Sequence, residues 1–164
     1  MRELSPSDVS PQRPPRPDPG HGGLLTSAAL FAMLERARVA RSSLILLTGP
    51  SGLSALLWLC RHGYERVGYL RPGAGPHEEP DALIVAHTCD AAAVGRLLAQ
   101  GPRVREGGVL VFQSSLPQNP DGGVDPIHRL LASGGYVVEA CHRGQRRELH
   151  VARRARRVAL SLAA

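Results

Sequence analysis

Residues 45–71 constrain the fold more than any other part of this sequence. They read as an apolar strand, a Gly-Pro-Ser-Gly turn, a helix that Gly63 ends, and a second strand. A helix-length crossover between two strands places them parallel in one sheet. A small turn between strand and helix lets backbone N–H groups and the helix N-terminus face an anionic or polar ligand. The segment therefore predicts a parallel α/β sheet with a ligand site beside this turn.

The same alternation of strands and helices continues along the chain. The expected strands are 43–48, 66–70, 82–86 and 107–113, and the expected helices are 24–41, 52–62, 90–100 and 125–133. Residues 136–154 read as two strands around a turn near residues 143–145, which is a terminal hairpin. The sequence therefore predicts an α/β fold with a mainly parallel sheet and a C-terminal antiparallel hairpin.

The 164 residues suit one domain with flanking segments. Residues 1–23 hold six of the 14 prolines and almost nothing to bury, so we expect a disordered lead. Residues 24–154 form the expected α/β domain, opened by a leading helix over 24–41. Residues 155–164 are expected to be a basic tail.

The formal charge of +6 comes mainly from the C-terminal end. The excess is supplied by Arg153, Arg154, Arg156 and Arg157. Such a cluster can bind an anionic partner, either nucleic acid or a membrane surface. All 20 basic residues are Arg, a bias typical of a GC-rich and therefore bacterial genome, so a solvated basic terminus is the simpler interpretation.

The three cysteines of the chain give an indication of its cellular compartment. Cys60, Cys89 and Cys141 lie far apart and form no C-x-x-C pair, so no disulfide framework is expected. The uncharged run over 42–60 is interrupted by Gly-Pro-Ser-Gly, and the N-terminus lacks the apolar core of a signal peptide. We therefore expect a cytoplasmic protein.

The segment "TGPSGLSALLWLCRHGYERVGYL" resembles the first βαβ unit of flavin-dependent oxidoreductases. Leu47 replaces the first glycine of that pattern, and Arg71 stands where the ribose-binding acid belongs. The rest of the chain is too short for the remainder of a flavoprotein. A flavin- or nicotinamide-dinucleotide-binding fragment is therefore kept only as an alternative.

A second resemblance covers residues 43–154, which are similar to class I S-adenosylmethionine-dependent methyltransferases. The glycine turn resembles that family's glycine-rich motif, and "PDALIVAH" resembles its fourth strand. "RVREGGVLVFQ" and "LLASGGYVVEACHRGQRRELHVARR" resemble its turn into the fifth strand and its closing helix and hairpin. The resemblance implies a Rossmann-like three-layer sandwich, S-adenosylmethionine as cofactor, and a small-molecule or protein methyl acceptor.

The resemblance also implies where the site lies. Thr48, Gly49, Ser51 and Gly52 would line the methionine end of the cofactor. His87 follows the "ALIVA" strand and would face the acceptor, where it could act as a general base. An alternative interpretation of His87-Thr88-Cys89 is a helix-capping turn.

Several residues depart from the family pattern. Thr48 matches an expected acid, Pro50 and Ser54 match flanking glycines, and Arg71 stands at the ribose-binding acid. Only eleven residues separate Leu70 from Ala82, so the usual third-strand region, which contacts adenine, is expected to be lacking. Two acids in this loop could replace the lost carboxylate or could be solvated loop charge. They are Glu78 and Glu79.

Four residues of two types, histidine and cysteine, are candidate metal ligands. The candidates are His87, Cys89, Cys141 and His142. In the family's strand order, three spacings of about 4.8 Å separate the strands that carry them, or about 14 Å. One ion cannot bridge that distance, so no metal is expected.

Two functional hypotheses follow. The first is a methyltransferase-like domain with a reduced cofactor site, either weakly active or non-catalytic. The alternative is a cofactor-free binding or accessory module that uses the Rossmann-like surface or the Arg-rich tail.

Overall fold

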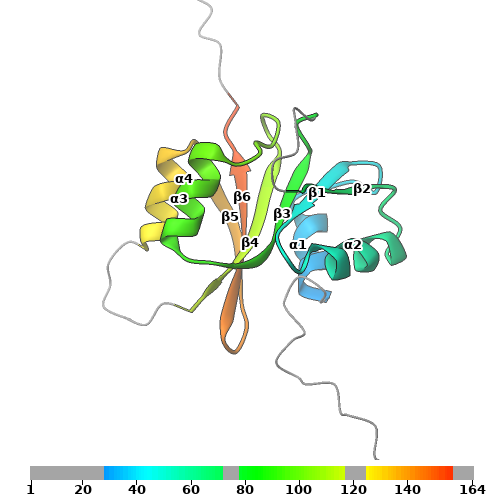
Figure 1. Ribbon diagram of the computed structural model, residues 1–164, viewed down its shortest axis with the longest axis horizontal. Helices are drawn as coiled ribbons and strands as arrows, with labels where there is room; N and C mark the ends of the chain where they lie inside the picture. Colours follow the sequence, from blue (N-terminus) through cyan, green and yellow to red (C-terminus); the bar gives the residue numbers. More distant parts are fainter. Residues whose placement is uncertain (1–27, 72–77, 117–124, 157–164) are drawn as a thin grey trace, which may run out of the picture.

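The computed structural model describes residues 28–71, 78–116 and 125–156, which form a sheet between two layers of helices (Figure 1). The helices are α1 (Ala28–Arg36), α2 (Gly52–Arg61), α3 (Ala91–Gln100) and α4 (Pro126–Ser133). The strands are β1 (Leu44–Thr48), β2 (Arg66–Tyr69), β3 (Ala82–Cys89), β4 (Val109–Ser115), β5 (Tyr136–Arg143) and β6 (Arg147–Arg154). The expected lead over 1–23, the first residues of the leading helix, Arg157 and the rest of the tail lie outside the described residues.

The six strands have the order β2-β1-β3-β4-β6-β5. Strands β2, β1, β3 and β4 are parallel, and β6 is antiparallel to both β4 and β5. The predicted three-layer α/β fold with a C-terminal antiparallel hairpin is therefore confirmed. Within the described ranges no strand lies beyond β2, so the third-strand region is lacking as predicted.

Both faces of the sheet are buried. Helices α1 and α2 cover one face with Leu30, Leu34 and Leu59, while α3 and α4 cover the other with Val94 and Leu131 (Figure 1). Because parallel strands are buried on both sides, they are apolar without interruption. This explains why β1 and β3 are apolar over consecutive positions.

Some element boundaries differ from the sequence-based expectation. The leading helix ends at Arg36 and not at residue 41, because Arg38 adopts a left-handed φ of 58° that no helix continues. Strand β3 extends to Cys89, so His87-Thr88-Cys89 is strand and not a capping turn. Asp90 alone caps α3, its carboxylate accepting from the Ala93 N–H at 2.7 Å.

Two irregularities interrupt the strand pairing. In β3 the register with β4 shifts between Val85 and Thr88, which leaves Ala86 and His87 outside the ladder. In β5 the register with β6 shifts between Val138 and Ala140, which leaves Glu139 as an extra residue. Such bulges re-aim the side chains that follow them, and both lie close to candidate sites. Among the described helices none is long and apolar enough to cross a membrane.

Candidate functional site

The glycine turn lies at the carboxyl end of β1. Thr48 ends the strand, Gly49 has a φ of +100°, and α2 begins at Gly52. A Cβ added to Gly49 would lie 2.5 Å from Nδ1 of His87. Glycine is therefore required at position 49 for its backbone conformation and for the approach of His87.

Tyr69, the last residue of β2, covers this turn. Its hydroxyl donates to the Gly49 carbonyl at 2.9 Å, and its ring lies so close to Gly52 that a Cβ there would overlap the ring edge. Tyr69 is 40% exposed, so the ring lies over the turn from the solvent side. The space next to Gly52 is therefore filled by the Tyr69 ring.

The polar backbone groups of the turn are bonded within the protein. The Ser51 N–H donates to the Ala86 carbonyl at 3.2 Å, and the Gly52 N–H donates to the Gly49 carbonyl at 3.1 Å. The Ser51 side chain makes no capping hydrogen bond at the start of α2. A turn that is to hold an anionic group needs N–H groups free to point at it, and these two are engaged.

His87 lies in the β3 bulge, against Gly49. Its Nδ1 is buried and has no hydrogen-bond partner among the described residues. The structure thus brings His87 together with Thr48, Gly49, Ser51 and Gly52 at one turn, although it directs the ring toward the glycine.

Glu78 and Glu79 lie elsewhere. Glu78 pairs with Arg66 at the start of β2, with the Glu78 Oε2 and Arg66 Nη2 atoms 3.4 Å apart. Glu79 pairs with Arg154 at the end of β6, at 3.5 Å. Both arginines belong to the amino-terminal edge of the parallel strands, opposite the glycine turn. The structure therefore does not bring these carboxylates to the turn.

Cys89 is also unsuited to chemistry at this edge. The side chain is 2% exposed, and burial together with the nearby Asp90 charge raises the pKa of its thiol to about 11. A thiol with this pKa stays protonated at neutral pH, and the thiolate is the nucleophilic form. The strand order also separates Cys89 from Cys141 by three strand spacings, as the sequence predicts.

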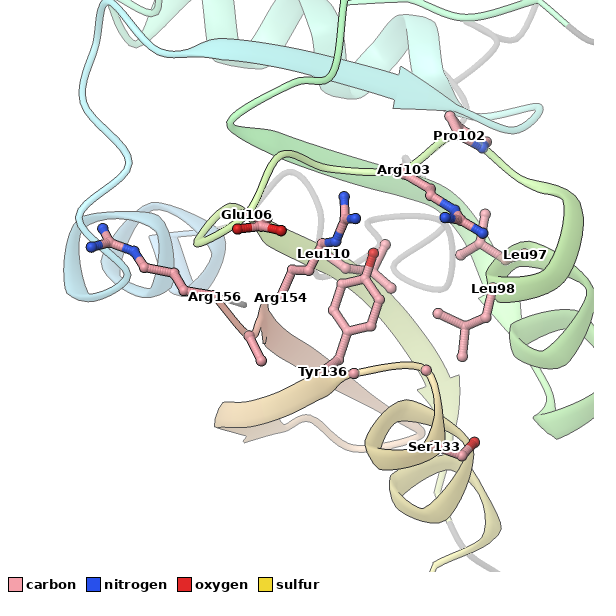
Figure 2. Close-up of a pocket in the computed structure, with 13 residues that line it drawn as sticks. Leu97, Leu98, Pro102, Arg103, Glu106, Leu110, Ser133, Tyr136, Arg154 and Arg156 are labelled. Carbon is pink, nitrogen blue, oxygen red and sulfur yellow. The ribbon is translucent and has the colours of Figure 1, made fainter. Parts of the chain in front are cut away.

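Two cavities lie at the amino-terminal edge and not at the turn. One of about 450 Å³ lies between the ends of α3, α4, β5 and β6, and Figure 2 shows Tyr136 in it with Arg154 beside it and Arg156 farther away. The other, of about 820 Å³, is lined by residues that include Arg36, Arg38 and Arg105. Both are therefore rich in arginine.

Arg153 and Arg154, expected as part of a basic cluster, belong to β6. Arg153 donates to the Glu139 carboxylate and to the carbonyls of Gly107 and Ala37, at 2.6 and 2.7 Å for the two carbonyls. Arg154 bonds the Val104 carbonyl and pairs with Glu79. These two arginines hold the domain together, while Arg156 lines both cavities.

Comparison with solved structures identifies the fold. A ribosomal protein L11 methylase from Lactobacillus delbrueckii subsp. bulgaricus has a TM-score of 0.55 at 16% identity, over 80% of this chain and 77% of that chain. A magnesium protoporphyrin IX methyltransferase from Synechocystis PCC 6803 with bound S-adenosylhomocysteine has a TM-score of 0.53 at 12% identity, over 77% and 81%. A methyltransferase dependent on S-adenosylmethionine from Aquifex aeolicus has a TM-score of 0.52 at 12% identity, over 74% and 87%. No family model and no curated protein sequence matches the chain.

The chain therefore has the class I methyltransferase fold. At identities of 12–16% this likeness shows the fold alone. The antiparallel β6 between β4 and β5 also differs from the strand order of dinucleotide-binding folds, which disfavours the flavin or nicotinamide alternative.

Two residues beside the turn differ from those that hold S-adenosylmethionine in the resembling family. In the resembling family the cofactor passes over the glycine turn, and an acid at the end of the second strand holds its ribose. Here Tyr69 fills the space over Gly52, and the position of the acid is held by the cation Arg71. The residue that sequence reasoning missed is Tyr69, whose only signal was an aromatic two positions before the expected acid.

Proposed function

We propose that this chain is a methyltransferase-fold domain with a reduced cofactor site, and that it acts as a binding module without transferring methyl groups. The observation that carries the proposal is the Tyr69 side chain, which packs on Gly52 and donates to the Gly49 carbonyl. A ligand that follows the family's path over the turn needs the same space.

The cost of opening the site supports this proposal. Moving Tyr69 away breaks its hydrogen bond to Gly49, worth about 0.5–1.5 kcal/mol net, and removes its ring from Gly52. Neither Glu78 nor Glu79 is then available at the end of β2, because both are paired at the opposite edge. The ribose hydroxyls would face Arg71, which can donate to them but cannot accept.

The arginine-lined cavities suit an anionic partner better than a neutral one. In this proposal the partner is held at the amino-terminal edge, through Arg103 and Arg156, and the Rossmann-like layers serve as the scaffold. A reducing cytoplasm fits the three free cysteines of the chain.

An active methyltransferase is the second candidate, and one observation favours it. His87 presents a buried Nδ1 without a partner in the described structure, beside the turn where a methyl donor would bind. If Tyr69 swings out, His87 could take a proton from an acceptor held in line with the methyl group.

Calorimetric titration of the wild-type protein separates these candidates. S-adenosylmethionine and S-adenosylhomocysteine are each added to millimolar concentration, with circular dichroism confirming that the sample is folded. We expect no heat beyond dilution, because the turn is closed and lacks a ribose acceptor. A saturating isotherm with micromolar affinity would refute the reduced site and favour the methyltransferase.

A further inference from the structure

Three potential metal ligands meet on the α4 face of the sheet, away from the glycine turn. They are His128 on α4, Cys141 on β5 and His150 on β6, and one ligand atom of each lies within 4.8 Å of the others. The Cys141 Sγ atom is 3.3 Å from Nδ1 of His150 and 4.0 Å from Nε2 of His128. Of the four candidates weighed from the sequence, only Cys141 belongs to this group.

The fold brings these residues together through a bulge. Cys141 lies directly opposite His150 in the β5–β6 ladder. The extra residue Glu139 shifts the alternation of β5, so that Tyr136 and Val138 before it face α3 and α4, and Cys141 after it does so too. Arg153 holds the bulge by binding the Glu139 carboxylate. The bulge therefore orients Cys141 toward α4.

The third ligand comes from α4. Asp125 caps this helix by accepting from the Ile127 N–H at 2.9 Å, and Ile127 and Leu131 are buried against the sheet. His128, half-buried on the same helix, meets the His150 ring edge-on, with their centroids 5.8 Å apart. The helix is thereby fixed with His128 above Cys141.

His150 is held as a preorganised ligand. It is fully buried and stacks on Phe112, with ring centroids 4.8 Å apart. Its Nε2 lies 2.8 Å from the Ser114 hydroxyl oxygen and 3.9 Å from the Glu148 carboxylate. Metal-binding histidines commonly donate the second ring N–H to such a group, which fixes the tautomer and the direction of the free nitrogen. In His150 that free nitrogen is Nδ1, and it faces Cys141.

A carboxylate beside the three residues suits a cation at this place. The Glu148 carboxylate lies 3.9 Å from Nε2 of His150, and its side chain is 15% exposed. A coordinated metal ion removes the proton of a ligating thiol outright, so Cys141 would bind as the thiolate.

We propose that His128, Cys141 and His150 form a Zn²⁺ site whose fourth position is open to water or to a ligand. One thiolate and two imidazoles are a ligand set typical of zinc, and three protein ligands leave one tetrahedral position free. Tetrahedral bond lengths place sulfur and nitrogen ligands about 3.6 Å apart, which lies between the 3.3 and 4.0 Å found here. The site does not involve the glycine turn, so it stands whether or not the chain binds S-adenosylmethionine.

Co²⁺ titration of the metal-free full-length protein tests the site, because Co²⁺ occupies tetrahedral zinc sites and reports its ligands by absorption. We expect one equivalent of Co²⁺ to give intense visible d–d bands and a near-ultraviolet thiolate charge-transfer band, and Zn²⁺ to displace it. Cys141→Ser removes the charge-transfer band, and His128→Ala weakens Zn²⁺ binding. Ser114→Ala keeps the band but lowers Zn²⁺ affinity by about 10- to 100-fold.

Matched controls exclude other ligands. Cys60→Ser and His142→Ala alter the same residue types at exposed positions outside the group and should leave the spectra unchanged. His150 is fully buried, so the test relies on Cys141 and His128, which are more accessible, with circular dichroism as the check of folding. A wild-type protein without the two sets of bands, or a Cys141→Ser variant that retains the charge-transfer band, overturns the proposal.

Discussion

The double variant Tyr69→Ala/Arg71→Asp is expected to bind S-adenosylhomocysteine about tenfold more tightly than the wild-type protein. The first change clears the space over Gly52, and the second restores an acid at the end of β2. A hydrogen bond to a charged group is worth about 1.5–3 kcal/mol, and 1.4 kcal/mol corresponds to a factor of ten in affinity. Calorimetry with millimolar ligand should therefore give a heat of binding with the double variant and none beyond dilution with the wild-type protein.

Two further variants test whether the gain in affinity comes from the ring of Tyr69 and from the position of the new acid. Tyr69→Phe retains the ring over Gly52 but loses the hydroxyl, so it should stay closed to the ligand. Arg61→Asp makes the same change of charge at the exposed end of α2 and should leave binding unchanged. If the double variant binds no better than Arg61→Asp, Tyr69 and Arg71 are not what closes the site.

Replacement of Arg153 by alanine is expected to lower the free energy of unfolding by about 2 kcal/mol. The Arg153 guanidinium joins three separate parts of the domain: Ala37 after α1, Gly107 before β4, and Glu139 in the β5 bulge. Its side chain is 31% exposed, so water can replace part of these interactions and limits the loss. Urea unfolding followed by circular dichroism gives the change.

The controls for this prediction test geometry as well as charge. Arg153→Lys keeps the charge but cannot reproduce the planar fork, so it should recover only part of the stability. Arg146→Ala removes an exposed arginine from the hairpin turn and should change the free energy of unfolding by less than about 0.5 kcal/mol. If Arg153→Ala and Arg146→Ala change the free energy of unfolding equally, Arg153 is a solvated basic residue and does not stabilise the fold.

The layers of the fold were predictable because local signals agreed with one another. The apolar runs of β1, β3 and β4, the Gly-Pro-Ser-Gly turn and the Asp125-Pro126 helix start each match the observed element. The eleven-residue link from Leu70 to Ala82 predicted the lacking third strand, because no helix–strand–helix unit fits in it. Such features depend on local sequence and chain length.

The site was less predictable because it depends on register and on long side chains. The two bulges leave no clear mark in the sequence, yet one places His87 against Gly49 and the other turns Cys141 toward α4. The reach of Arg66 and Arg154 decides where Glu78 and Glu79 are bound. Pairing of residues distant in sequence can be found only in the folded chain.

The terminal hairpin shows how small a difference in register separates the predicted pairing from the observed one. The turn near residues 143–145 was expected, and the Gly144 N–H to Arg147 carbonyl bond places it slightly later. With the observed register Cys141 faces His150, whereas a turn centred on residue 144 would pair Cys141 with Arg147. A small error in the predicted position of a turn therefore changes which residues pair, and the cluster of candidate metal ligands is then not predicted.

The central claim, that Tyr69 closes the glycine turn, is tested most directly by nuclear Overhauser effects in isotopically labelled protein. With only three tyrosines in the chain, the ring protons of Tyr69 can be assigned and their contacts to the Gly52 α protons followed. We predict that these contacts are present in the free protein and keep their intensity when S-adenosylhomocysteine is added to millimolar concentration. Their absence, or their replacement by contacts between Gly52 and the ligand, would contradict the account.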